Sequence, residues 1–189
     1  KYRLMINSIK LELSGGDFEI TQGEDFSVTS DCLNHLVYEK DGVWHVVSDP
    51  YHGKYAKTVI TLPFLRAFTN FQINLTDGAL NLCKTDCENM EFNLKNASAE
   101  SDTVTSENLY ISIAHSNLRI LTDSQSTNID CGYGTLDLRL TRGSYSIKSQ
   151  CGMGKVTLNS SVIPKKFECN NGNRKINVIC GMGDVNRNT

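Results

Sequence analysis

A turn with one fixed spacing recurs along this chain and constrains its fold more than any other feature. Its most recognisable copies read DCGYG, QCGMG and ICGMG, at 130–134, 150–154 and 179–183. In each copy, five positions separate the last apolar residue before the turn from the first one after it, as in Cys131 to Leu136, Cys151 to Val156 and Cys180 to Val185. The same spacing occurs without cysteine, at Leu13 to Phe18, Leu75 to Leu80 and Ile113 to Leu118. Because leucine or isoleucine can replace cysteine, the position requires a modest apolar side chain and not sulfur.

These turns recur at nearly equal intervals. The turn that begins at 113 is followed by turns at 131 and 151, and the interval from 75 to 113 divides into two similar units if one is centred on Leu94. The interval from 151 to 180 is longer, and we interpret it as one unit with a nine-residue insertion within 159–173. A period near 19 is typical of one coil of a β-solenoid, with two or three short strands and tight corners.

Alternation of apolar and polar residues, broken by Gly, Asn, Asp and Ser, predicts an all-β protein. Glycine is expected at the corners because a sharp turn needs a residue at positive φ, where a Cβ would clash. The predicted structural turn ladder consists of Cys131, Gly132, Gly134, Cys151, Gly152, Gly154, Cys180, Gly181 and Gly183. The segment 1–60 looks less regular and contains a hairpin signal at Asp41-Gly42. We therefore predict a single domain, 1–189, with an irregular antiparallel cap over 1–60 and solenoid coils over 61–189.

Composition argues against two classes of partner. The chain has 19 Lys and Arg against 21 Asp and Glu, and its longest basic run is Lys165-Lys166, so nucleic acid is not an expected partner. No stretch reaches the roughly 18 to 20 apolar residues that span a bilayer, so we expect no membrane insertion by this segment. The first residue is Lys1 and not Met, which leads us to expect an upstream segment.

The seven cysteines do not have the spacing of a metal site. Zinc ligands come in close pairs, whereas Cys131, Cys151 and Cys180 occur once per coil, so we interpret them as a buried, reduced ladder. Cys83 and Cys87 form the closest pair and can be unpaired structural thiols, a small-loop disulfide or half of a metal site. No cofactor and no metal is expected.

Catalytic residues are not expected either. The four histidines are His35, His45, His52 and His115, and none of them follows a pattern that would place it beside a nucleophile. The outward positions that follow the turns carry no row of carboxylates of the kind found in polysaccharide-cleaving β-helices.

Two features of the sequence provide candidate binding residues: a cluster of aromatic residues and the outward polar residues. Tyr38, Trp44, Tyr51 and Tyr55 are close in sequence and suggest an aromatic contact patch, although half-buried core aromatics explain them equally well. Outward Asn, Thr, Ser and Asp would give a wettable surface able to hydrogen-bond a glycan or a protein, and any soluble solenoid needs such a surface too.

Four segments resemble the bacterial putative-adhesin domain family of unknown function: VYEKDGVWHV, VITLPFLRAFTNFQINLTDGALNL, NIDCGYGTLDL and INVICGMGDVN. The resemblance extends from about Leu11 to Val185. It implies a right-handed β-helix or β-roll, often carried behind a membrane segment and displayed at the cell envelope. It supplies no catalytic residues.

The sequence thus predicts a non-catalytic, right-handed β-solenoid of the cell envelope, an adhesin or surface-presented binding and assembly module. Its expected partners are an envelope protein or a glycan, with self-association through the open edge of the last coil. Two alternatives stay open: a carbohydrate-active β-helix enzyme, and an envelope-stress sensory module that acts through protein contacts. The high cysteine count also keeps a cytoplasmic location open.

Overall fold

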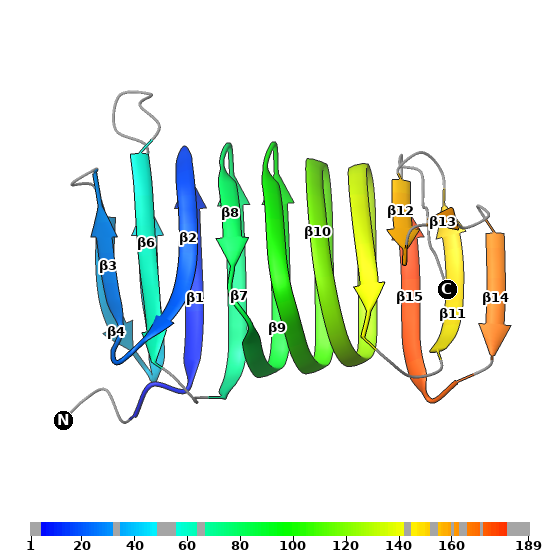
Figure 1. Ribbon diagram of the computed structural model, residues 1–189, viewed down its shortest axis with the longest axis horizontal. Helices are drawn as coiled ribbons and strands as arrows, with labels where there is room; N and C mark the ends of the chain where they lie inside the picture. The colour runs from blue at the N-terminus through cyan, green and yellow to red at the C-terminus, as the bar shows by residue number, and fades with distance from the viewer. Residues whose placement is uncertain are drawn as a thin grey trace.

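The fold is built from β-strands in a single mixed sheet. A computed structural model describes residues 5–31, 35–48, 56–63, 67–141, 145–151, 155–159, 161–162, 166–170 and 172–180, and these contain 15 strands and no α-helix. Figure 1 shows the strands standing side by side in a row, with the blue and cyan N-terminal strands at one end, green strands in the middle and the yellow to red C-terminal strands at the other end. The all-β prediction is confirmed, whereas the right-handed solenoid stays a prediction.

The strands are β1 (Ser8–Ser14), β2 (Gly16–Gly23), β3 (Ser27–Ser30), β4 (His35–Lys40), β5 (Val43–Ser48), β6 (Ala56–Pro63), β7 (Phe68–Thr76), β8 (Ala79–Leu82), β9 (Thr85–Lys95), β10 (Ser98–Leu140), β11 (Tyr145–Cys151), β12 (Lys155–Leu158), β13 (Ser161–Val162), β14 (Lys166–Asn170) and β15 (Arg174–Cys180).

Parallel pairing between equivalent positions of successive repeats organises the middle of the chain. Leu75 of β7 lies opposite Leu94 of β9, which lies opposite Ile113 of β10. The predicted unit centred on Leu94 is therefore confirmed. Within the long strand β10, segments 18 positions apart also lie side by side, since the Thr122 hydroxyl donates to the Val104 carbonyl at 3.1 Å.

One residue at positive φ marks the corner of each repeat. These residues are Asp77 (φ 52), Asn96 (φ 49), His115 (φ 49) and Gly134 (φ 137), which are evenly spaced along the chain. Asp, Asn and His are among the residues that most readily accept the left-handed region. Backbone hydrogen bonds join successive corners, as from the Asp77 amide to the Lys95 carbonyl at 3.0 Å. A positive-φ residue is thus present in each of these turns, but the expectation that it is a glycine holds only for Gly134, the second glycine of DCGYG. In TDGA the residue is Asp77 and not Gly78, because an Asp side chain tolerates the left-handed region.

Aligned apolar side chains fill the interior between the strands. The row formed by equivalent positions of consecutive strands is buried throughout: Leu11, Ile73, Phe92, Ile111, Ile129 and Val178. Each such side chain stabilises the fold by roughly 1.5–3 kcal/mol on burial. Because a single repeat covers only part of this row, its core is completed by the repeats on either side.

The N-terminal region differs from the predicted antiparallel cap. β1 pairs in parallel with β7, and β2 pairs in parallel with β8, so that Leu13 lies opposite Leu75 and Phe18 opposite Leu80. Among the described strands up to β6, antiparallel pairing joins only β3 with β6 and β4 with β5. The physical reason is that the segment 13–18 carries the same corner as the later repeats. The hairpin at Asp41-Gly42 is confirmed, with φ angles of 54° and 77°.

The C-terminal strands depart from sequential order. β15 pairs in parallel with β10 on one side and with β11 on the other, although it follows both in the chain. The insertion predicted within 159–173 contains β14, which pairs antiparallel with β11. Cys151 lies opposite Cys180 in this register. Gly152, Gly154, Gly181 and Gly183 lie outside the described residues, so the ladder as a whole stays a prediction.

Among the cysteines whose side chains the structure describes, Cys83, Cys87 and Cys169 are free thiols. Cys131 and Cys87 are buried, and Cys83 is half-buried. Desolvation by burial, with a smaller contribution from Asp86, raises the pKa of Cys87 to about 12, and burial also raises the pKa of Cys83. A disulfide between Cys83 and Cys87, one of the alternatives considered from the sequence, is not formed.

Replacing Gly134 by Ala should destabilise the protein by more than about 2 kcal/mol. Its φ is positive, and an added Cβ would lie 2.0 Å from the Ser116 carbonyl oxygen. Gly132→Ala is the matched control from the same turn, because its Cβ would meet only the Ile113 carbonyl oxygen at 3.5 Å. We expect the control to stay within about 1 kcal/mol of the wild type in chemical denaturation. Equal losses in the two variants would contradict this account of the corner.

Cys87 should resist alkylation while the protein is folded. With a pKa of about 12, about one Cys87 thiol in ten thousand is ionised near pH 8, and the thiolate is the reactive form. Iodoacetamide labelling followed by peptide mass spectrometry should find Cys87 unmodified in native buffer and modified in guanidinium chloride. Rapid modification in native buffer would show that this thiol is not part of the core.

Candidate functional site

A shallow groove of about 540 Å³ crosses β5, β1, β7, β9 and β10 on one face of the molecule. We call it the axial groove, because its lining repeats from one strand to the next and it therefore runs across the strands. Two rows of outward side chains form its walls. The amide row consists of Asn70, Asn89 and Asn108, and the mixed row consists of His45, Lys10, Gln72, Glu91 and Tyr110.

The amide row is a chain of hydrogen bonds that all point the same way. Asn108 Nδ2 donates to Asn89 Oδ1 at 2.9 Å, and Asn89 Nδ2 donates to Asn70 Oδ1 at 3.0 Å. The register places these residues directly opposite one another on β7, β9 and β10. Each amide has two N–H donors and two acceptor lone pairs, so Asn89 keeps one of each for a ligand.

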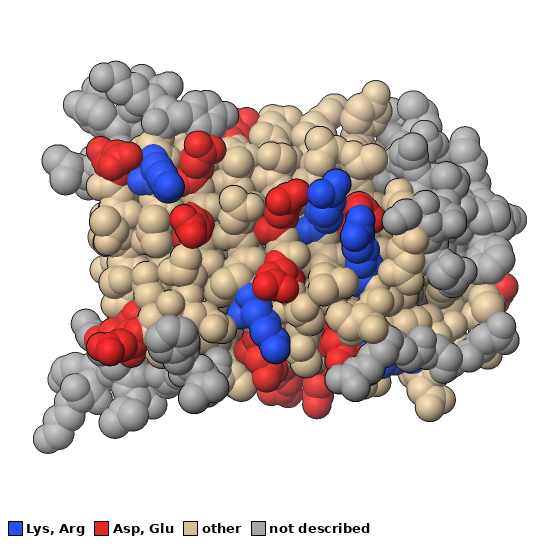
Figure 2. Space-filling model, in the orientation of Figure 1, with Lys and Arg blue, Asp and Glu red and all other residues tan. Residues whose placement is uncertain are grey.

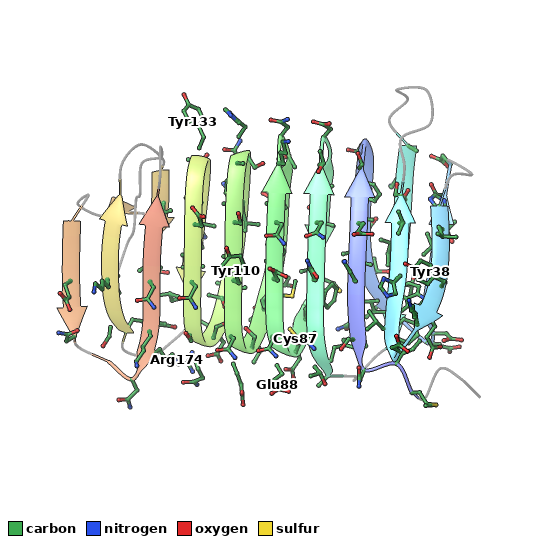
Figure 3. The ribbon with its side chains drawn as sticks, turned by 180° about the vertical axis from the view of Figure 1, so that it is seen from behind. Tyr38, Cys87, Glu88, Tyr110, Tyr133 and Arg174 are labelled. Atoms are coloured by element: carbon green, nitrogen blue, oxygen red, sulfur yellow. The ribbon has the colours of Figure 1, made fainter. Side chains whose placement is uncertain are left out.

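Two aromatic features belong to the mixed row: a stacked pair at its β5 end, and Tyr110 on β10, beyond which Asn128 continues the lining. The Tyr110 ring is 40% exposed on β10, and Tyr38 of β4 stacks on His45 with ring centroids 4.5 Å apart and planes 6° apart. Figure 3, which views this face, shows Tyr38 and Tyr110 at the same height along the strands. This follows from the register, which joins Tyr38 through His45, Lys10, Gln72 and Glu91 to Tyr110.

The aromatic patch predicted from the sequence is only partly on this surface. Trp44 is 5% exposed and packs against Phe26, with ring centroids 4.9 Å apart. It lies opposite Glu39, whereas Tyr38 lies opposite His45, so the alternation of the strands puts Trp44 in the interior and Tyr38 outside. Trp44 is therefore a core residue and not a contact residue. Tyr51 and Tyr55 lie outside the described residues.

Charge in the axial groove is sparse and balanced. Lys10 forms an ion pair with Glu12 at 3.5 Å, and Glu91 is the acidic member of the mixed row. The rest of the two rows consists of amides, a tyrosine and a histidine. This lining suits a ligand that hydrogen-bonds and that carries little net charge.

The opposite face, built from β6, β2, β8 and the other side of β10, has a different chemistry. Arg119 pairs with Glu100 at 3.3 Å and with Asp137 at 3.5 Å, and Arg139 lies 3.8 Å from Asp137. Figure 2 shows acidic and basic side chains interspersed on this face. Exposed pairs of this kind stabilise a protein by about 1 kcal/mol or less each. Because Arg119 stands between Glu100 and Asp137, the two carboxylates do not form an adjacent acid pair.

A third cluster joins β15 to the end of β10. Arg174 forms an ion pair with Asp123 and lies over the Tyr145 ring, 6.0 Å from its centroid. The hydrogen bond to Asp123 raises the pKa of Arg174, and burial raises the pKa of Tyr145. The cluster connects β15 with β10 and β11, and Arg174 is the member that contacts both of the others.

Within the described part of the chain, no group of three or more His, Cys, Asp or Glu side chains is arranged to hold a metal ion. That part of the chain also lacks a helix of sufficient length and hydropathy to cross a membrane.

The amide row was not singled out from the sequence, although a signal for it exists. Asn70, Asn89 and Asn108 follow one another at a constant spacing of 19, which is the length of the repeat. The constant spacing of these three asparagines is visible in the sequence in the same way as the spacing of the apolar residues.

The sequence matches no protein-family model, and no curated protein shows significant similarity to it. Among solved structures, the fold is similar to that of a putative cell adhesion protein from Clostridium sporogenes, with a TM-score of 0.46 and 15% sequence identity. The alignment covers 98% of this chain and 94% of that chain. A likeness this distant carries no information on function.

Proposed function

We propose that this chain is a non-catalytic β-solenoid domain of a bacterial cell envelope that binds an extended ligand in the axial groove, as an adhesin or a surface-presented binding module. The observation that carries the proposal is the amide row, in which equivalent side chains on three consecutive strands are hydrogen-bonded into one array. Such an array presents the same donor and acceptor once per strand. A ligand that extends over several strands can use all of them.

The solenoid part of this proposal is supported by the register. Parallel pairs join β7 to β9, β9 to β10 and β10 to β12, and in each pair the partners are about one repeat length apart in the chain. Coils joined in this way form a rigid platform, because each is fixed by backbone hydrogen bonds to both neighbours. The envelope location rests on the resemblance of the turns to those of bacterial adhesin domains.

Binding to envelope material should depend on the amide row. Asn89→Ala, combined with Asn108→Ala, should lower the affinity for isolated cell-wall and membrane fractions at least about fivefold, since each lost hydrogen bond contributes about 1 kcal/mol. Asn81→Ala is the matched control, because Asn81 is an exposed asparagine on β8, on the opposite face. Biolayer interferometry with immobilised protein gives the affinities, and thermal unfolding checks that the variants fold. If both variants bind as the wild type does, the axial groove is not the binding site.

Self-association through an open sheet edge is a second part of the proposal. β4 is the last of the described strands on this face, and Leu36, Val37 and Tyr38 are all exposed, Leu36 by 60%. An exposed apolar edge strand readily pairs with another chain. In an antiparallel pair with a second copy centred on Val37, His35 would face Glu39 and Leu36 would face Tyr38, so the strand is complementary to itself.

Leu36→Lys should therefore weaken a dimer that forms at high protein concentration. Sedimentation velocity over a concentration series should show the wild type shifting toward a dimer and this variant remaining a monomer. Thr29→Lys on β3, the polar edge strand of the other face, serves as the control and should dimerise normally. A wild type that stays monomeric at the highest concentration would contradict the edge pairing.

A further inference from the structure

The spacing, charge and aromatic side chains of the axial groove together identify a class of ligand. We propose that the groove binds a linear, uncharged polysaccharide whose sugars are joined by equatorial β-linkages, lying across the strands with about one sugar per strand. This inference rests on the proposed function and adds the chemical nature of the ligand to it.

Spacing is the first argument. Neighbouring strands lie about 4.8 Å apart, so the amide row offers a donor and an acceptor at this interval. An extended chain of equatorially linked hexopyranoses advances by about one strand spacing per sugar and carries hydroxyl groups, both donors and acceptors, on every sugar. A peptide strand advances by about 3.3 Å per residue and falls out of step with the amides. The repeat therefore favours a polysaccharide over a peptide.

The direction of the amide row adds to this match. Because Asn108 donates to Asn89 and Asn89 donates to Asn70, the side-chain dipoles are aligned. Aligned hydrogen bonds polarise one another, which strengthens the free donor at one end of the row and the free acceptor at the other. A polysaccharide is also directional, since every sugar has the same orientation along the chain. The groove should therefore bind its ligand in one orientation.

Charge is the second argument. A polyanionic glycan would need several unpaired cations along its path. Among the described groove-lining residues Lys10 is the one lysine or arginine, and it is paired with Glu12 at 3.5 Å. Glu91 faces the same path and would repel carboxylates or sulfates. An uncharged chain avoids both the repulsion and the desolvation of buried charge.

The aromatic side chains beside β5 and on β10 are the third argument. A tyrosine ring provides an apolar face with a polar hydroxyl, which suits a sugar that has an apolar C–H face and polar edges. Tyr110 lies on β10, and the Tyr38–His45 stack lies beside β5. The path from β5 to β10 crosses four strand spacings, or about 19 Å, which corresponds to four or five sugars.

Isothermal titration calorimetry with oligosaccharide ladders tests the proposal directly. The probes are uncharged β-1,4-linked ladders of glucose, N-acetylglucosamine, mannose and xylose, each from the disaccharide to the hexasaccharide. At least one ladder should bind with an affinity that rises with each added sugar up to about the pentasaccharide and then levels off. Maltohexaose, whose α-linkages curve the chain, and an oligogalacturonate, which is extended but charged, should each bind at least tenfold more weakly.

Variants connect the binding to the groove. Tyr110→Ala should lower the affinity for the preferred hexasaccharide about tenfold, while Tyr110→Phe keeps the ring and should retain most of the binding. Asn89→Ala should lower it about fivefold, and Asn81→Ala on the opposite face should leave it unchanged. With Tyr110→Ala, the affinity should also stop rising at a shorter oligosaccharide, which a general loss of stability would not produce.

The outcomes separate this inference from the proposed function. The polysaccharide assignment would be overturned if none of the uncharged ladders bound. It would also be overturned if maltohexaose bound equally well, or if the charged oligomer bound more tightly. If a protein or a charged glycan from the envelope fractions then binds and Asn89→Ala weakens it, the groove is a binding site for another ligand. If Asn89→Ala weakens no interaction at all, both the ligand and the site are wrong.

Discussion

The backbone pairing of each repeat with the repeat beside it is the interaction on which the rest of the structure depends. It requires a corner residue at positive φ once per repeat, at Asp77, Asn96, His115 and Gly134. Where the next repeat approaches most closely, as at Gly134 against Ser116, only glycine leaves enough room. With the corners in place, the parallel strands bring like positions together, and the buried row from Leu11 to Val178 follows.

The same register determines the chemistry of the surface. A side chain that points outward on one strand has neighbours at the equivalent positions of the adjacent strands, so polar residues become rows in the same way as apolar ones. On one face the rows are amides accompanied by aromatic side chains, and on the other they are ion pairs around Arg119. The two faces therefore suit different contacts, and in the axial groove Asn89 keeps a donor and an acceptor beyond those it uses within the amide row.

Features that depend on a few neighbouring residues can be predicted from this sequence, whereas features that depend on strand pairing cannot. The corner spacing located Leu94 as a missing unit, and the Asp41-Gly42 hairpin was identified from two residues, because both depend on backbone conformation over a few positions. The aromatic patch was misjudged at Trp44. Nearness in the sequence placed Trp44 with Tyr38, but the β4–β5 hairpin register puts the two side chains on opposite faces of the sheet.

The sequence by itself determined the all-β character, the spacing of the turns and the need for a positive-φ residue in them, since spacing and φ preferences are properties of short segments. Only the tertiary structure decided the order of the strands, with β1 between β5 and β7 and β15 between β10 and β11. It also decided that Asn70, Asn89 and Asn108 share one face with Tyr110 and with the Tyr38–His45 stack. The reason is that a strand pairs with whichever open edge the stacked repeats present, and the positions of those edges depend on the whole chain.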